Sequence, residues 1–441
     1  MTSSEARDAV WARLDESRSE MVSFLGEYIR HKSINPTRAL DFEPGGTESC
    51  QRWLARWLKD ASCFEQVVEL EAAPGQINVV ATMPAAAPQR HRSLMFNGHS
   101  DVVPVTEQEY ADWAGGDPWS GDVVDGAVYG RGACDMKGGN TAVIFAMRAI
   151  AETGITIPGR STASFVIGEE SGEVELGPHH LLEAGFTADL AVVTEPSGLL
   201  VCPAAVGWFF FRVSVEGQAA HAAGRGRSIH PSREGVVGVN AIDVMTRIMG
   251  RLAQLEHQWG LYEAHPLMSP GTMALNPVQI SGGGMQATTP EACSAVWAVT
   301  LNPNRTCADV IEEVEQVIDS MALGDAWLAE HPPVVTYPFL HPQYEPVNLP
   351  IEHPAVGILT GAVGSASGEP RGMSIMPTPS DANVLAARGQ PTMICGPGQL
   401  VGNGVHGLDE HIDVEEVVLA AMAYAALMMD WCSRPHEAET T

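Results

Sequence analysis

Three short apolar runs, at residues 93–96, 164–167 and 188–193, constrain the fold of this 441-residue chain more than any other feature. Each run has the length of a buried strand, and helical segments separate them. Strands that alternate with helices are typical of a parallel α/β sheet. Because ligands bind such sheets at the carboxyl ends of the strands, we expect functional residues directly after these runs.

Histidine and carboxylate residues occupy all three of these positions. His99 and Asp101 follow the first run, Glu169 and Glu170 the second, and Glu195 the third. A metal-bound imidazole usually has its second ring nitrogen held by a carboxylate or a carbonyl group, which the spacing of His99 and Asp101 suits. Two consecutive glutamates point in different directions, so one can bind a metal ion while the other handles a proton. The shared position at strand ends favours one functional site over separate solvated loops.

Two residues outside these runs complete the candidate ligands. Asp135 lies in the glycine-rich segment 126–139, which matches no phosphate-binding fingerprint and turns the chain before a helix predicted at 141–152. For Asp135 taken alone, an ordinary partner of a helix N-terminus is the alternative. His406 follows a fourth predicted strand, at 391–395.

The candidate ligands are two imidazoles and three carboxylates, without a thiolate: His99, Asp135, Glu170, Glu195 and His406. Structural zinc sites favour cysteine, so this set predicts a catalytic site for zinc first, or for manganese or cobalt. Five ligands exceed what one tetrahedral ion uses, and a carboxylate that bridges two divalent ions resolves the excess. Two ions lower the pKa of bound water toward ~7, and Glu169 is placed to accept its proton. The residues thus predict a two-metal hydrolase.

The composition argues against several classes of partner. A net charge of -29 does not suit binding to nucleic acid or to an anionic membrane, since both need a basic face. The eight cysteines form no C-x-x-C pair, which is typical of reduced cytosolic thiols. The N-terminus has no basic-then-apolar signal, and no apolar run reaches the roughly 18 residues of a membrane span. We therefore expect a cytoplasmic protein that acts on a small molecule.

The length of the chain predicts two domains. Residues 1–205 and 345–441 contain the α/β pattern, which opens with a helix predicted at 9–31, and together they are predicted to form one catalytic domain. Between them, residues 206–344 contain strands with two helices interleaved, which indicates a compact α+β insert. The proline-rich segment 332–350 is predicted to be the linker that returns from this insert.

Five motifs occur together in the chain: Gly98-His99-Ser100-Asp101-Val102-Val103-Pro104, Tyr129-Gly130-Arg131-Gly132 with Asp135-Met136-Lys137-Gly138, Glu169-Glu170-Ser171-Gly172, Glu195-Pro196, and Gly396-Pro397-Gly398 followed by His406. In this combination the chain resembles the M20 metallopeptidase and deacylase family, over nearly its whole length. Members include acetylornithine deacetylase, succinyl-diaminopimelate desuccinylase and glutamate carboxypeptidase. The resemblance implies a di-metal catalytic domain with a mixed, mainly parallel sheet flanked by helices, plus an inserted α+β lid or dimerisation domain.

The resemblance also implies how the ligands divide between two ions. Asp135 would bridge the pair. His99 and Glu195 would complete one side, and Glu170 and His406 would complete the other.

Three further roles follow from the same resemblance. Asp101 would orient His99. Glu169 would be the general base and later the acid that protonates the leaving nitrogen. His221, in the insert, would reach the neighbouring subunit's site in a homodimer formed through the lid domain and stabilise the oxyanion there.

Two positions in the insert depart from the family pattern. Many members carry an Asn and a substrate-binding Arg where this chain has Ala287 and Thr300. A threonine cannot make the bidentate pair that an arginine makes with a carboxylate. The familiar substrates of the family therefore do not transfer directly to this chain.

The leading hypothesis is hydrolysis of a C–N amide bond in an N-acyl amino acid or a dipeptide. One alternative is an aminohydrolase that releases ammonia from an aromatic amine such as a nitroanthranilate, which the aromatic run 208–211 and the missing arginine favour. A more remote alternative is a metal-binding scaffold without activity. Glu169 argues against the scaffold, because metal binding alone does not need it.

Overall fold

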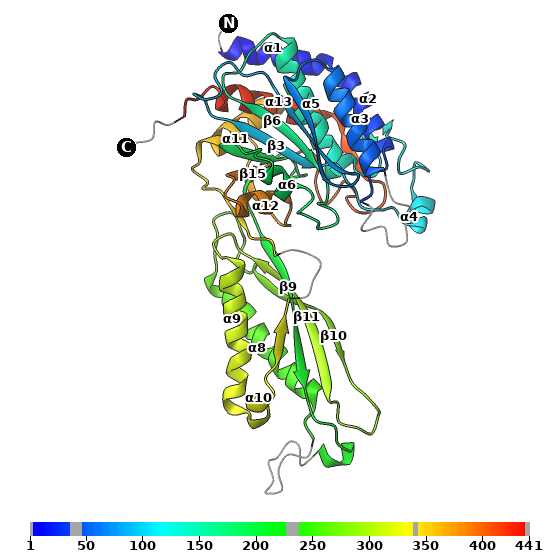
Figure 1. The fold of residues 1–441 in the computed structure, drawn as a ribbon, viewed down its shortest axis with the longest axis vertical. Coiled ribbons are helices and arrows are strands. Elements are labelled where there is room, and N and C mark those ends of the chain that lie inside the picture. The colour runs from blue at the N-terminus through cyan, green and yellow to red at the C-terminus, as the bar shows by residue number, and fades with distance from the viewer. Residues whose placement is uncertain (1–2, 36–45, 226–237, 338–342, 437–441) are drawn as a thin grey trace. The chain divides into compact units, whose positions relative to one another are not determined.

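The computed structural model describes residues 3–35, 46–225, 238–337 and 343–436, and the chain divides into two compact units (Figure 1). Unit 1 comprises Met1–Ala205 and Val347–Thr441, and unit 2 comprises Val206–Pro346. Unit 2 is therefore an insertion in the chain of unit 1. Among the described residues, no helix combines the length and the apolar character that crossing a membrane requires.

Unit 1 is built on a nine-stranded sheet in the order β1-β2-β6-β3-β7-β15-β8-β13, with β14 also paired to β8. Its central strands β6, β3, β7 and β15 run parallel, and its first pairs are antiparallel. The strands are β1 (Gln66–Ala73), β2 (Gln76–Thr82), β3 (Leu94–His99), β6 (Ser161–Val166), β7 (Leu190–Val193), β8 (Val201–Ala205), β13 (Val347–Asn348), β14 (Met373–Met376) and β15 (Thr392–Ile394). The predicted α/β class with a central parallel sheet is confirmed.

Helices cover both faces of this sheet (Figure 1). One layer consists of α1 (Ser3–Glu16), α2 (Arg18–Arg30), α3 (Thr47–Asp60), α5 (Gly138–Glu152), α11 (Pro354–Ser367) and α13 (Val414–Trp431), and the other of α6 (Pro178–Glu183) and α12 (Asp381–Ala387). Along β3, Leu94 and Phe96 pack toward the first layer and Met95 toward the second, because successive strand residues alternate between faces. With both faces buried, the polar chemistry of unit 1 gathers at the strand ends.

Smaller elements of unit 1 lie in the loops near those ends. They are the helix α4 (Glu107–Asp112) and a three-stranded sheet of β4 (Asp122–Val124), β5 (Ala127–Tyr129) and β16 (His411–Asp413). β16 pairs with β5, so the segment directly before α13 lies against the glycine-rich segment that leads to Asp135.

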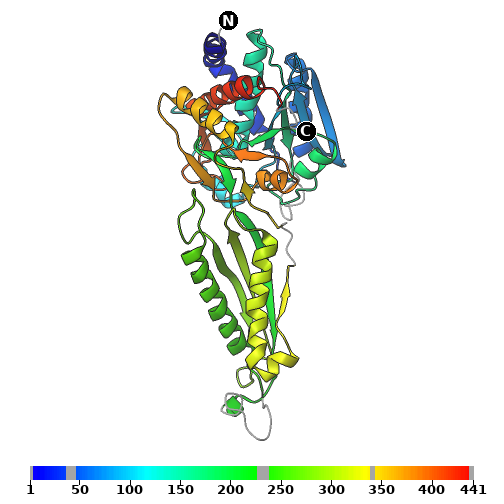
Figure 2. The same cartoon turned by 90° about the vertical axis from the view of Figure 1, so that its left-hand side faces the viewer.

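Unit 2 is an antiparallel sheet in the order β10-β11-β9-β12, with α8 and α9 on one face (Figure 2). Its elements are β9 (Gly207–Glu216), η2 (Ala222–Gly224), α8 (Ala241–Tyr262), β10 (Ala274–Gly282), β11 (Ala292–Leu301), α9 (Cys307–Asp319), η3 (Ser320–Gly324), α10 (Ala326–Glu330) and β12 (Val334–Thr336). Phe209 and Phe211 of β9 lie in the core beneath the helices, where Phe211 stacks on Trp297 with ring centroids 5.2 Å apart. The predicted α+β character of the insert is confirmed.

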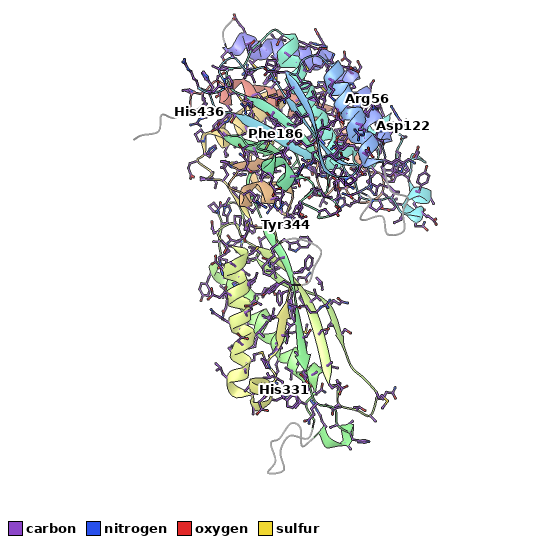
Figure 3. The ribbon with its side chains drawn as sticks, viewed as in Figure 1. Arg56, Asp122, Phe186, His331, Tyr344 and His436 are labelled. Atoms are coloured by element: carbon purple, nitrogen blue, oxygen red, sulfur yellow. The ribbon has the colours of Figure 1, made fainter. Side chains whose placement is uncertain are left out.

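The chain enters and leaves unit 2 along neighbouring paths. The main-chain N–H of Trp208 donates to the carbonyl of Tyr344 at 2.9 Å, and Tyr344 donates back at 2.8 Å (Figure 3). The segment 332–350, predicted as the returning linker, contains the short strands β12 and β13. These short strands form by pairing with β9 and β8, which lie far away in the sequence. The proline-rich segment alone therefore does not predict them.

Candidate metal centre

The ends of three strands gather most of the candidate ligands. β3 ends at His99, Glu169 and Glu170 follow β6, and Glu195 follows β7. These strands are parallel neighbours in the order β6-β3-β7, so their carboxyl ends meet at one edge of the sheet.

Asp135 and His406 reach the same edge from loops. Asp135 lies in a π-helical turn, η1 (Ala133–Lys137), directly before α5. Its backbone leaves the helical conformation there, with φ -115° and ψ 94°. His406 lies before β16 with a φ of 57°, in the left-handed region that residues other than glycine rarely adopt.

The first group of ligands surrounds His99. Its Nε2 lies 3.0 Å from Oδ1 of Asp135 and 3.7 Å from Oε1 of Glu195. The ligand atoms of these three residues all lie within 4.8 Å of one another, and all three side chains are buried.

The second group surrounds His406. Its Nε2 lies 3.1 Å from Oε1 of Glu170 and 3.4 Å from Oδ2 of Asp135. The two carboxylate oxygens of Asp135 therefore face different histidines. The structure brings all five predicted ligands together as two groups that share Asp135, and a third group, of His99, Glu169 and Glu170, overlaps both of them.

Asp101 holds the second ring nitrogen of His99 through its main chain. Nδ1 of His99 lies 2.9 Å from the carbonyl oxygen of Asp101, whereas the nearer carboxylate oxygen is 3.9 Å away. The other carboxylate oxygen accepts the N–H of Gly168 at 3.0 Å, in the turn before Glu169. The Asp101 side chain thus positions the loop that carries the adjacent glutamates.

The two histidines attract protons strongly because carboxylates surround them. Burial lowers the pKa of His99, but the hydrogen bond with Asp135 and the charge of Glu195 outweigh it and raise that pKa well above its ordinary value. For His406, hydrogen bonds with Asp135 and Glu170 raise the pKa to about 11. Burial opposes ionisation of Asp135, yet its bonds to both histidines hold its pKa below the ordinary value.

At the other acids of the centre, burial outweighs the charge of His99, which lowers their pKa values. Burial, followed by the charges of neighbouring carboxylates, raises the pKa of Glu169 and of Glu195 well above the usual range. Burial likewise raises the pKa of Asp381 to about 7, and neither of its oxygens has a hydrogen-bond partner within the described part of the chain. This buried excess of negative charge suits a site for cations.

The donor set fits a pair of divalent ions. Each group offers one imidazole nitrogen and carboxylate oxygens from two residues, a combination typical of catalytic zinc and related metals. The carboxylate of Asp135 presents one oxygen to each group, as a bridging ligand does. The residues present therefore fit the metal pair that the motifs imply.

Two residues with structural roles at the centre were missed by sequence reasoning. Glu410 is fully buried and accepts the main-chain N–H of Asp135 at 3.1 Å. Arg131, also buried, donates to Glu410 at 2.8 Å. Arg131 lies inside the motif Tyr129-Gly130-Arg131-Gly132, whereas nothing in the sequence marks Glu410 apart from its position four residues after His406.

The remaining predicted site residue, His221, belongs to unit 2, whereas all five ligands and Glu169 belong to unit 1. Nδ1 of His221 accepts the N–H of Ala223 at 3.2 Å at the start of η2, and its main chain forms a bridge with Thr288. Ala287 and Thr300 lie in the same unit, and Thr300 pairs with Trp208 across β11 and β9.

Comparison with protein families identifies the chain. Residues 95–430 match the model of Peptidase family M20/M25/M40. The chain belongs to this family. Membership makes it a metal-dependent hydrolase of carbon–nitrogen bonds, as the motifs predicted.

Relatives of this M20 family member include amide hydrolases of small molecules. The N-formyl-4-amino-5-aminomethyl-2-methylpyrimidine deformylase of Bacillus subtilis (strain 168) is 29% identical over 434 residues, which are 96% of this chain and 97% of the relative. The succinyl-diaminopimelate desuccinylase of Cereibacter sphaeroides is 27% identical over 345 residues, 77% of this chain and 84% of the relative. The crystal structure of aminopeptidase PepT from Bacillus cereus shares the fold, with a TM-score of 0.70 at 18% identity over 93% of this chain and 98% of that one.

Proposed function

We propose that the centre holds two divalent ions, with Asp135 as the bridging ligand. One ion takes His99 and Glu195, and the other takes Glu170 and His406. The support is the division of the five side chains into two groups that share the oxygens of Asp135. Zinc suits these nitrogen and oxygen donors best, and manganese or cobalt are the next candidates.

Glu169 is proposed to move the protons of the reaction. When bound, a metal pair supplies Lewis acidity toward a water molecule and an amide carbonyl. The Glu169 carboxylate takes a proton from the attacking water and gives it to the departing nitrogen, so that amide and water become carboxylic acid and amine. The raised pKa of Glu169, caused by burial and then by the charges of Glu195 and Glu170, suits a group that holds this proton between the two transfers.

The substrate class is proposed to be an N-formyl amide of a small primary amine on a heteroaromatic ring. Two deformylase relatives align over 96% of this chain, whereas the desuccinylase and acetylornithine deacetylase relatives align over 76–91% of it. Thr300 occupies the position where a family arginine would bind a substrate carboxylate. A substrate without a carboxylate, such as the aminomethylpyrimidine of the deformylase, does not need that arginine.

The ring of such an amine is proposed to occupy a cavity of about 510 Å³ in unit 1, whose lining contains neither the five ligands nor Glu169 but includes residues close to two ligands in the sequence. Pro196, which follows Glu195, lies in its wall, as do residues 399–401, which precede His406. Apolar and polar groups both line it: Leu200, Ile375, Met376 and Leu400 on one hand, and Ser197, Ser374, Gln399 and Arg371 on the other.

A substrate panel tests the proposal. The metal-loaded protein is incubated separately with N-formyl-4-amino-5-aminomethyl-2-methylpyrimidine, N-succinyl-diaminopimelate and N-acetylornithine, and both products are measured by mass spectrometry. We expect the highest kcat/KM for the formyl compound. Preference for the succinyl or the acetyl compound would refute the substrate class, and release of ammonia from the 4-amino group of the pyrimidine would refute the reaction.

The variant Glu169→Gln tests the proton transfer. It keeps the size of the side chain but removes the base, so turnover should fall by roughly 10²–10⁴-fold while the bound metal per chain stays unchanged. Retention of activity would contradict the mechanism. Loss of metal together with activity would instead mark Glu169 as a ligand.

A homodimer through unit 2 is proposed from its exposed sheet edge. β10 is an edge strand, and its Val278 and Ile280 are 50% and 56% exposed. Apolar edge strands are prone to pair with another chain. Ile280→Lys should convert a dimer to monomers in sedimentation experiments. If His221 acts across that dimer, mixing His221→Ala with Glu169→Ala protein should restore part of the activity in exchanged dimers.

A cytoplasmic location is proposed because all eight cysteines are free, and seven of them are buried. The aromatic run that favoured the aminohydrolase alternative is not proposed as a substrate site, since Phe209 and Phe211 form part of the core of unit 2.

A further inference from the structure

Glu410 holds the segment that carries Asp135 by hydrogen bonds from both its side chain and its main chain. Oε1 accepts the main-chain N–H groups of Cys134 and Asp135 at 3.0 and 3.1 Å. Oε2 accepts Nη1 of Arg131 at 2.8 Å, and the Glu410 carbonyl accepts the N–H of Gly130 at 2.8 Å. The side chain of Glu410 is 0% exposed.

The conformation of Asp135 explains why such an acceptor is needed. Its backbone is not helical, so its N–H is available for a partner other than the regular helical carbonyl. A buried N–H without an acceptor costs roughly 1–3 kcal/mol, and Glu410 supplies acceptors for two adjacent ones. The direction in which the Asp135 side chain points therefore depends on Glu410.

Glu410 also belongs to the segment of His406. Only three residues separate them, and β16 begins directly after Glu410. One carboxylate thus joins the backbone of the shared ligand to the loop of the ligand that is most exposed.

We infer that Glu410 is a positioning residue that fixes Asp135 and the His406 loop to each other, so that the two ligand groups form one dinuclear centre. The inference rests on the proposed metal centre and adds a residue that is neither a ligand nor a proton carrier. Residues that orient metal ligands typically contribute 10–100-fold to metal affinity.

Only a carboxylate satisfies the three donors that converge on this side chain. A glutamine has one oxygen acceptor, so its amide group would face either Arg131 or the two main-chain N–H groups, donor against donor. Glu410→Gln is therefore a nearly isosteric change that removes the function.

The first test is metal affinity, measured by titrating Co²⁺ into metal-free protein and following its visible absorption. Glu410→Gln should weaken binding by roughly 10–100-fold. The matched control is Glu256→Gln, which alters a carboxylate that accepts the main-chain N–H of Leu275 at 2.9 Å in unit 2, whereas η1 and the five ligands belong to unit 1. The control should bind Co²⁺ within about twofold of the wild type.

The second test needs no metal. Amide hydrogen exchange of the peptide spanning η1 should be faster in metal-free Glu410→Gln than in the wild type, because the N–H groups of Cys134 and Asp135 lose their acceptor. Glu256→Gln should leave that peptide unchanged. If Glu410→Gln does not fold, Glu410→Asp keeps the charge, shortens the reach and should show both effects to a smaller degree. Unchanged exchange and unchanged Co²⁺ affinity in the folded variant would overturn the inference.

Asp135→Asn separates this inference from the proposed function. If that variant binds Co²⁺ as tightly as the wild type, Asp135 is not a ligand and the proposed metal centre fails. If Asp135→Asn loses metal while Glu410→Gln does not, the centre stands and the role of Glu410 fails.

Discussion

The two halves of the candidate centre are built in opposite ways. The side chain of His99 is 1% exposed and lies at the end of a strand that has paired neighbours on both edges. The side chain of His406 is 51% exposed and lies on a loop. The sheet therefore fixes one half before any ion binds, whereas the other half depends on how its loop is anchored.

Polar contacts anchor the loop of His406, together with the packing of Val405 against the core. Asn403 accepts the N–H of Gln399 at 2.9 Å and donates to the carbonyl of His411 at 3.1 Å. Asp409 accepts the N–H of Ala114 at 2.8 Å. Such contacts hold a loop at little cost in stability, and they leave its histidine close to solvent where a substrate can approach.

Asp135→Asn should have the largest effect, because Asp135 belongs to both halves. The amide has a single, neutral oxygen, so one of the two proposed ions would lose its Asp135 ligand and the other would keep only an uncharged one. A loss of several kcal/mol of transition-state stabilisation corresponds to roughly a 10³-fold fall in kcat/KM. Steady-state kinetics with excess metal checks this. A fall of less than tenfold would mean that the halves do not share Asp135.

His99→Ala and His406→Ala should separate the halves by stability. In metal-free protein, His99 partners Asp135 in a buried site, and loss of one partner of a buried pair costs about 3–5 kcal/mol. His406 is half exposed, so its loss should cost about 1 kcal/mol or less. Urea unfolding in the presence of a chelator measures both. Equal losses would contradict the contrast between a strand-held half and a loop-held half.

All five ligands were predicted, and the ones with the clearest local signal are those that directly follow a buried strand. The apolar runs before His99, Glu169 and Glu195 are local signals, and parallel strands bring their ends together whatever the remaining details. Glu410 has no local signal, since its partner Asp135 lies 275 residues earlier in the chain. Its role depends on the pairing of β16 with β5, which no periodicity in either short segment reveals.

The break in the predicted first helix is a second feature that the sequence pattern does not reveal. A single helix was predicted at 9–31, and the structure instead ends α1 at Glu16 and begins α2 at Arg18. At Ser17 the backbone has φ -86° and ψ 2°, and the carbonyl of Arg13 accepts both the Ser17 hydroxyl at 2.8 Å and its N–H at 3.1 Å. Apolar periodicity continues across Ser17, so the sequence pattern does not show the break.

In metal-free protein, the pH dependence of the unfolding free energy should come from the exposed half, through His406. The pKa of His406 is raised to about 11 in the folded state, chiefly by Asp135 and Glu170, from about 6.5 when unfolded. Because the folded state holds the proton more tightly, this contribution is complete below about pH 6.5 and is lost as pH rises toward 11. His406→Asn should flatten the fall in unfolding free energy over that range, by less than about 1 kcal/mol given solvent screening. An unchanged slope would show that His406 carries no such proton.

The smallest effect is expected at Asp409, whose side chain anchors the His406 loop by accepting the N–H of Ala114. Asp409→Gly removes the acceptor for Ala114 while suiting the φ of 55° at this position, and Asp409→Asn is the matched control because its side chain keeps an oxygen acceptor. Loss of one solvent-accessible hydrogen bond is worth about 0.5 kcal/mol, roughly twofold in affinity. Asp409→Gly should therefore weaken the binding of only one Co²⁺ ion, the one whose binding His406→Ala abolishes. Binding of the other Co²⁺ ion, which His99→Ala abolishes, should be unchanged. If Asp409→Gly weakened both steps alike, the loop would support the whole centre, and the two halves would not be separately anchored.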